Sequence, residues 1–276
     1  MIGQNWHPMF PVDGFPATIS FNTGAPFVPF SRNPQIRYTV TVGWLSVLAT
    51  AYSQRDFVHS GPAGASSKYL RNSGIPGVDI QLQIRPDSSE HIFSVGTDYK
   101  TIVPSLVTYT GYKTTESLGS YAVYSAMKFK YKPVSIKFMA VLAQNASDML
   151  MIGGYAIRDT VNPDRGALHY TNVNTGSGWI DIHTNSKKVQ PGIYAGYTKN
   201  LGTSNSAKGN YYGRGTNIAY VYRIAPRISI FSGKSIFATE IEYTTAAYGK
   251  NKLSGVVMDT KEVSNIRLLL SYIYNF

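Results

Sequence analysis

The chain has 276 residues, of which 43% are hydrophobic, with a mean hydropathy of -0.14 and no run of about 18 apolar residues that could cross a bilayer as a helix. Because cysteine is absent, a disulfide framework and thiolate metal sites are excluded. The 26 lysines and arginines outnumber the 15 aspartates and glutamates, so the net charge of +11 produces a field that attracts anionic solutes or acidic lipid head groups.

The chain opens without the basic start, apolar stretch and small-residue cleavage site of a secretory signal. We therefore expect either a mature form or a portion of a longer protein. No linker or low-complexity tract divides residues 1–276, which predicts a single domain. The basic residues are dispersed and form no dense block, so we do not expect nucleic acid as a partner.

Segments with a two-residue period recur along the chain, each close to the roughly 9 to 11 residues that a tilted strand needs to cross a bilayer. About twelve strands are predicted, at residues 2–7, 35–42, 44–53, 77–85, 91–100, 120–131, 134–145, 176–185, 189–199, 216–224, 235–248 and 264–276.

The connections between these strands alternate short and long. Short turns are predicted near Gly43, at Pro86-Asp87-Ser88-Ser89, at Lys132-Pro133, at Ser186-Lys187-Lys188 and around Ala225-Pro226. Long connections cover residues 8–34, 54–76, 101–119, 146–175, 200–215 and 249–263. Short turns on the periplasmic side and long loops outside are typical of transmembrane barrels. This parity requires residues 149–158 to be loop, and a strand there would change the register.

The last segment alternates most regularly and ends on an aromatic residue. One side holds Ile266, Leu268, Leu270, Tyr272, Tyr274 and Phe276. A terminal phenylalanine, with tyrosine two places before it, is typical of bacterial outer-membrane β-barrels, in which the last strand carries the assembly signal. The pattern predicts an all-β fold, a transmembrane antiparallel up-and-down β-barrel in the bacterial outer membrane. Tyr274 and Phe276 are then the assembly signal, read by the barrel assembly machinery, and lipid or lipopolysaccharide surrounds the wall.

Within several strands one side is apolar and the other carries the charges. In the strand at 77–85, for example, Ile80 and Leu82 alternate with Asp79 and Gln81. The apolar side is expected to meet lipid and the charged side to line a wet lumen. The predicted lining comprises the basic residues Arg37, Arg85, Lys100, Lys128, Lys130, Lys137, Arg223 and Arg267, and the acidic residues Asp79, Asp98, Asp181, Glu240 and Glu242.

Basic residues lead this lining by eight to five, which favours anions in a water-filled constriction. The alternative is that each inward arginine or lysine pairs with a neighbouring carboxylate and braces the wall.

Three motifs could suggest other chemistry. Asp181 and His183 share a strand side, but no second histidine lies nearby in the sequence, so hydrogen bonding is expected instead of metal binding or acid-base catalysis. Glu240 and Glu242 are interpreted as countercharges rather than as a glycosidase pair. Residues 202–209 lack the second glycine and the hydroxyl that a phosphate loop needs. We predict no enzyme activity, no cofactor and no metal site.

Two pairs of segments resemble a known family. The segment Ile2-Gly-Gln-Asn-Trp6, followed by a proline-rich loop and then Arg32-Asn-Pro-Gln-Ile-Arg-Tyr-Thr39, resembles a motif pair of DcaP-like trimeric porins. Residues 145–155 and 196–202 are similar to the version carried by Bacteroidetes-type members.

The resemblance implies a 16-stranded barrel that assembles as a homotrimer and passes small anionic solutes such as dicarboxylates through an arginine-rich constriction. Arg37 is the best matched candidate for a lumenal basic residue. The chain departs from the family in lacking a signal peptide and an N-terminal periplasmic helical segment, and in showing about twelve strands. We therefore expect a C-terminal portion, with a complete twelve-stranded barrel as the alternative.

The leading functional hypothesis is a passive outer-membrane porin for small solutes with a preference for anions. A second is a surface binding or adhesion barrel with a plugged lumen and functional extracellular loops. A third is a soluble all-β carbohydrate-binding protein, which would fold without detergent.

Overall fold

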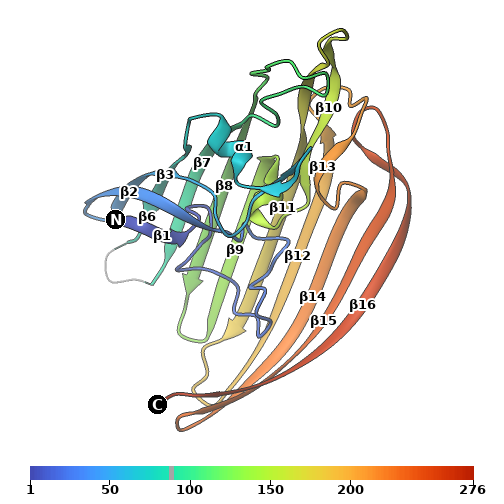
Figure 1. Ribbon diagram of the computed structural model, residues 1–276. Helices are drawn as coiled ribbons and strands as arrows, with labels where there is room; N and C mark the ends of the chain where they lie inside the picture. The colour runs from blue at the N-terminus through green and yellow to red at the C-terminus, as the bar shows by residue number, and fades with distance from the viewer. Residues whose placement is uncertain (87–89) are drawn as a thin grey trace.

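A computed structural model describes residues 1–86 and 90–276 of the chain. It is dominated by one antiparallel sheet in which each strand of the main path pairs with the next, so the predicted up-and-down topology is confirmed (Figure 1). The path runs through β1 (Ile2–Trp6), β2 (Arg32–Val42), β3 (Leu45–Tyr52), β6 (Gly77–Ile84), β7 (Ile92–Ile102), β8 (Leu118–Lys130), β9 (Val134–Gln144), β11 (Ala167–Thr184), β12 (Val189–Thr203), β14 (Ile218–Ser232), β15 (Ser235–Asn251) and β16 (Val257–Tyr274).

All twelve predicted strands are present on this path. Two further strands belong to the same sheet but lie off the path, because β10 pairs with the first part of β11 and with β13. The remaining elements are short and lie in the long connections. They are β4 (His59–Gly61), β5 (Gly64–Ser66), α1 (Lys68–Asn72), the 3-10 helix η1 (Ala146–Met149), β10 (Gly153–Asn162) and β13 (Tyr211–Arg214). No helix among the described residues is long and apolar enough to cross a membrane.

Three boundary predictions are wrong. Ala225 and Pro226 lie inside β14, and the turn follows at residues 233–234. Proline is tolerated there because the pairing between β14 and β15 is interrupted between Ile224 and Arg227, while the apolar alternation continues to Ile230. The predicted connection at 146–175 is not all loop, since β10 begins at Gly153, within the segment 149–158, and β11 begins at Ala167. Because β10 stands off the main path, the register of the other strands is unaffected.

The third wrong boundary is the long connection at 249–263, because β15 continues to Asn251 and β16 already begins at Val257. In the predicted turn at Pro86-Asp87-Ser88-Ser89, residues 87–89 lie outside the described residues.

The outer face of the sheet is a continuous apolar surface. Ile266, Leu268 and Leu270 of β16 are 70%, 64% and 79% exposed, whereas Arg267, on the other face of that strand, bonds inward to Glu242. The same alternation holds in β2, β6 and β14. Successive side chains of a strand point to opposite faces, so one strand supplies both a lipid-facing and a lumen-facing surface.

Exposed aromatic residues lie toward both ends of this outer face. Tyr121 lies near the start of β8 and Tyr131 just beyond its end, and both are exposed. Ten residues span about 34 Å along a strand, or about 26 Å of height at a tilt near 40°, which matches the apolar band of an outer-membrane barrel. Tyrosine rings are favoured at both membrane boundaries because the ring is apolar and the hydroxyl is wet.

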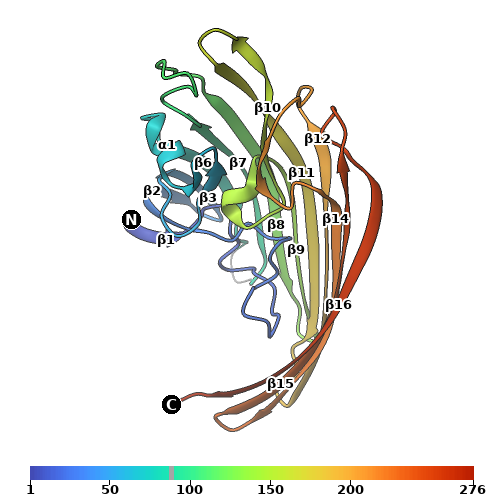
Figure 2. The same cartoon turned by 45° about the vertical axis from the view of Figure 1, so that its right-hand side comes forward.

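The sheet curves into a wall whose concave side encloses the first long connection (Figure 2). Among the described residues, β1 and β16 are the two ends of the wall and do not pair with each other. The inward-folded connection, residues 7–31, is called the inner loop below. Its Met9, Phe10, Phe27 and Val28 are buried against small and apolar side chains on the inner faces of β8 and β9. Along these two strands, part of the side that was expected to line a wet lumen is therefore covered by apolar packing.

We predict that deleting Phe276 impairs assembly into the outer membrane. Its side chain is fully exposed and its ring contacts Tyr274 edge-on at 5.3 Å between centroids, so little packing within the chain is lost by the deletion. The measurement is the heat-modifiable, folded fraction in outer-membrane preparations. The matched control is Phe237→Ala, which removes an exposed aromatic ring from the outer face of β15. Normal assembly without Phe276, or an equal loss in the control, would contradict a terminal signal.

Candidate functional site

The inner loop is attached to the concave wall by hydrogen bonds to its backbone. The carboxylate of Glu240, which is fully buried, accepts bonds from the N–H groups of Ile19 at 2.9 Å and Ser20 at 3.2 Å. Arg223 donates to the carbonyl oxygen of Ala25 at 3.0 Å. Because these wall residues come from β14 and β15, the loop that starts at β1 reaches across the concavity to the far strands.

The Phe27 ring of the inner loop packs directly against Gly196 of β12. The Oγ of Ser177 donates to the carbonyl of Phe27 at 2.9 Å, and the Arg223 guanidinium lies 5.5 Å from the Phe27 ring centroid. A Cβ at Gly196 would lie 2.6 Å from Cγ of Phe27, which is too close for any side chain. Glycine at 196 therefore lets the loop approach the wall.

A second segment folds inward from the long connection after β9. It contains η1, and its Asp148 accepts a bond from Lys100 of β7 at 2.5 Å, both side chains being buried. The two inward segments also contact each other, since the N–H of Phe30 donates to the carbonyl of Met149 at 2.9 Å. Together they cover part of the inner wall.

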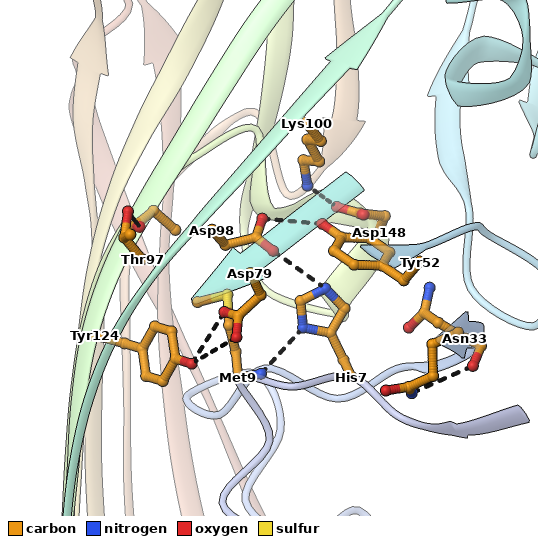
Figure 3. A network of polar contacts seen from close by, with 12 residues as sticks. His7, Met9, Asn33, Tyr52, Asp79, Thr97, Asp98, Lys100, Tyr124 and Asp148 are labelled. Atoms are coloured by element: carbon orange, nitrogen blue, oxygen red, sulfur yellow. Dashed lines mark hydrogen bonds and ion pairs between the residues drawn. The ribbon is translucent and has the colours of Figure 1, made fainter. Parts of the chain in front are cut away.

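Around this ion pair lies a buried polar network (Figure 3). Gln54 donates to Asp148 at 2.8 Å, and Nε2 of His59 lies 3.4 Å from the same carboxylate. On the other side, Tyr52 donates to Asp98 at 2.9 Å. The network joins β3, β4, β7 and η1, so it fixes the η1 segment against the wall.

His7 of the inner loop completes the network. Its Nε2 lies 3.8 Å from Asp98, while its Nδ1 accepts the N–H of Met9 at 3.3 Å. The neighbouring Asp79 accepts a bond from the hydroxyl of Tyr124 at 3.0 Å. Asp79 and Asp98 are thus both used as acceptors for buried tyrosine hydroxyls, as Figure 3 shows.

Burial changes the pKa of His7, His59 and Asp148, the titratable network residues that lie outside the long strands. Burial lowers the pKa of His7 to about 3 and that of His59 to about 4, so both imidazoles are neutral at pH 7. Burial opposes the charged form of Asp148, but attraction to His59, which is protonated only at low pH, and to Lys100 outweighs burial and lowers the pKa of Asp148 to about 2. The network therefore holds one cation and one anion at its centre.

Two further ion-pair groups brace the inner wall. Asp181 is fully buried and accepts a hydrogen bond from one terminal nitrogen of Arg227 at 2.9 Å. The other terminal nitrogen forms an ion pair with it at 2.8 Å, and Nδ1 of His183 lies 3.0 Å away. Glu242 lies 2.5 Å from Arg267 and 3.6 Å from Arg223. A carboxylate with these partners is compensated, so such pairs contribute to the rigidity of the wall more than to its net charge.

Two lysines stand directly opposite each other on the inner wall. Lys128 of β8 and Lys137 of β9 are register partners. Nζ of Lys137 donates to the carbonyl of Phe15 at 3.0 Å and lies 5.6 Å from its ring centroid. Neither lysine forms an ion pair with a carboxylate in the described part of the chain. Arg37 forms none there either, and it donates to Gln35 at 3.0 Å. Directly opposed like charges are unfavourable in a sheet, so this arrangement favours the presence of an anion.

A cavity of about 200 Å³ lies between the inner loop and the wall at this point. Its lining includes Arg37, Arg85 and Lys128, with Asp13 as its acidic member. Asp13 and Arg85 are hydrogen bonded to each other. The cavity therefore retains the positive charges of Arg37 and Lys128.

The predicted lining residues thus fall into separate groups. Ion pairs hold Lys100, Arg223, Arg267, Asp181 and Glu242. Asp79 and Asp98 accept bonds from tyrosine hydroxyls, and Glu240 accepts bonds from the backbone of the inner loop. Arg37, Arg85, Lys128 and Lys137 surround the cavity or its lysine pair, whereas Lys130 lies at the exposed rim, where it bonds to Glu90 at 2.6 Å. The alternative of pairs between basic residues and carboxylates therefore describes two of the five acidic residues and five of the eight basic ones.

Sequence reasoning missed Arg227, Asp148 and the inner loop. Arg227 lies on the same inward face of β14 as Arg223. It was missed because the predicted turn at Ala225-Pro226 ended the strand before it. Asp148 lies in a connection, where no alternation shows the direction of a side chain. Both could have been suspected only as buried countercharges. Arg227 and Asp148 carry opposite charges and cancel, whereas Asp13 adds a carboxylate that the predicted lining lacked, so the basic excess falls by one.

No group of three or more histidine, cysteine, aspartate or glutamate residues that could hold a metal ion occurs among the described residues.

Comparison with known proteins supports the fold. No family model matches the chain, and no curated protein matches its sequence. Among solved structures, the outer-membrane expressed OmpT of Vibrio cholerae matches with a TM-score of 0.56 at 11% identity, over 99% of this chain and 76% of that one. A NanC porin covers 90% of this chain and 95% of its own at 11% identity, but with a TM-score of only 0.32.

The continuous apolar outer face, the aromatic residues at both of its ends and the likeness to OmpT define the class. The fold is that of a bacterial outer-membrane β-barrel protein. Membership of the DcaP-like family and the sixteen strands that it implies stay predictions.

We predict that acid weakens the network around Asp148. Below pH 6.5 the histidines of an unfolded chain bind protons, but His7 and His59 stay neutral in the folded state until about pH 3 and 4. Stability should therefore fall as the pH falls from about 6.5 to about 4, by up to about 1.4 kcal/mol per pH unit for each histidine. The measurement is Tm against pH in detergent.

The test variant is His59→Gln, which should flatten this pH dependence, and the control is His91→Gln outside the network. An unchanged slope in His59→Gln would contradict the assignment.

Proposed function

We propose that this chain forms a water-filled pathway through the outer membrane and passes small solutes by diffusion, with a preference for anions such as dicarboxylates. The observation that carries the proposal is the pair of opposed lysines, Lys128 and Lys137, beside Arg37 on the inner wall. Their charges are held on rigid strands and have no carboxylate partner among the described residues.

The charges nearest the cavity decide which solutes it favours. Most inward carboxylates are already bonded to arginine, lysine or tyrosine, as Asp181 is to Arg227 and Asp148 is to Lys100. The cavity charges that form no ion pair with a described carboxylate, Arg37 and Lys128, are basic. Fixed cations around a narrow aqueous passage lower the energy of an anion there and raise that of a cation. Two carboxylates on one solute could contact Arg37 and the lysine pair together.

The inner loop sets the width of this passage. Its residues Asp13, Gly14 and Phe15 lie against the same basic groups, since Arg85 bonds Asp13 and Lys137 bonds the carbonyl of Phe15. A solute would therefore pass between the loop and the strands β2, β6 and β8, where the lining includes Gln81, Gln83 and Ser94 in addition to the charges. No covalent chemistry is needed for this role, and we propose a non-enzymatic channel.

The proposed setting includes outer-membrane lipid and lipopolysaccharide around the wall, the barrel assembly machinery during insertion, and a homotrimer, as the resemblance to DcaP-like porins implies. The second candidate is a binding or adhesion barrel, which the two inward-folded segments favour because they fill part of the concavity with apolar side chains. A folded protein that inserts into bilayers without conducting would support this second candidate.

We predict anion selectivity that depends on the lysine pair. In planar bilayers under a salt gradient, the reversal potential of the unmodified protein should indicate preference for anions. The triple variant Arg37→Gln, Lys128→Gln, Lys137→Gln should lower the anion-to-cation permeability ratio by about threefold or more.

The matched control is Lys130→Gln, which neutralises one basic residue at the exposed rim, where Lys130 is already bonded to Glu90. Solvent screens that site, so the control should move the reversal potential much less. An equal reversal potential in the unmodified protein and the triple variant would contradict the proposed role of these three residues.

A further inference from the structure

A second cavity, of about 370 Å³, lies among the long connections at the end of the sheet opposite the C-terminus. Its lining comes from the connection between β7 and β8, from β10 and β11, and from the segment leading into β13. Figure 1 shows these elements together at the end of the sheet that lies away from the C-terminus. The cavity is therefore separate from the lumen and from its basic residues.

Three tyrosines line the cavity. Tyr170 and Tyr212 pack on the buried ring of Tyr155, with centroid distances of 5.7 and 5.3 Å, so their positions are fixed by a small core beneath. Tyr109 approaches from the opposite connection, where its side chain is 75% exposed. Its ring lies against Gly166, where φ is +65° and a Cβ would lie 2.5 Å from the ring. Glycine at 166 thus allows both the turn and the close ring.

The connections that form the cavity are tied together. The hydroxyl of Thr110 donates to the carbonyl of Arg165 at 2.5 Å, and the guanidinium of Arg165 lies 5.6 Å from the ring centroid of Tyr112. Glu116 lies 3.6 Å from Nε2 of His169, whose Nδ1 is 2.7 Å from Asp159. The cavity is thus built by contacts between distant segments, rather than by one loose loop.

The chemistry of the lining selects a class of ligand. Glu116 is its one charged residue among the described residues, and hydroxyl and amide groups of Ser105, Thr108, Thr114 and Asn210 supply donors and acceptors. Flat tyrosine rings combined with hydroxyl, amide and carboxylate groups suit a pyranose ring, which has an apolar C–H face and a rim of hydroxyls. An anion would be repelled by Glu116.

We infer that this cavity binds the end of a neutral oligosaccharide from outside the cell, with one or two sugar rings stacked on Tyr109 and hydrogen bonded to Glu116. The volume lies at the lower end of the range for ligand sites, which fits one or two rings. This inference does not depend on conduction through the lumen.

The test is isothermal titration of the detergent-solubilised chain with four neutral disaccharides: maltose, lactose, cellobiose and N,N′-diacetylchitobiose. At least one should bind saturably, with a Kd on the order of 1 mM. Tyr109→Ala and Glu116→Gln should each weaken that binding by about tenfold. Tyr109 is mostly exposed and glutamine matches glutamate in size, so both variants should keep the fold.

The matched control is Tyr38→Ala, which removes an exposed tyrosine from the outer face of β2 and not from the cavity lining. It should leave the Kd unchanged, as should Arg37→Gln in the lumen. Absence of saturable binding to all four disaccharides would overturn the inference. So would an equal loss of affinity in Tyr38→Ala, because the effect of removing a tyrosine would then not be specific to the cavity.

Discussion

The structure depends on one constraint: every side chain of a membrane-spanning strand must suit either hydrocarbon or the interior. Because neighbouring residues point to opposite faces, the two requirements are met by alternation, and a shift of one residue would exchange them. On β6, Ile80 and Leu82 are exposed on the outer face while Asp79 is buried and bonded to Tyr124. The same constraint explains why the backbone forms ladders, since an unpaired N–H or C=O in hydrocarbon costs several kcal/mol.

The inner side is less uniform than the outer side because two different surfaces meet there. On β8 and β9, small side chains such as Ala126 and Ala143 accept the apolar residues of the inner loop. Elsewhere the wall carries compensated ion pairs, and around Lys128 and Lys137 the charges lack acidic partners among the described residues. The inner loop thus divides the concavity into a packed part and a charged part, and the proposed passage follows the charged part.

The sequence was sufficient for the strands and their faces, since period-two alternation reports local geometry directly. The positions of Ile80 and Arg267 on opposite faces followed from it without knowledge of any contact. Pairing across the lumen could not be predicted, because Lys100 and Asp148 are 48 residues apart and Asp148 lies in an irregular segment. For the same reason, the return of residues 7–31 into the concavity was not foreseen: it depends on bonds from Glu240 and on the space at Gly196, both far along the chain.

The most direct test of the account is the environment of successive residues along one strand. The chain has no cysteine, so single cysteines can be placed at each of positions 220 to 231, spin-labelled, and reconstituted into lipid vesicles. Accessibility to oxygen, which partitions into hydrocarbon, should alternate with accessibility to a water-soluble nickel complex, with oxygen favoured at the even positions 222 to 230. A uniform response along the strand, or oxygen accessibility at the odd positions, would contradict the assignment of an outer apolar face and an inner polar one.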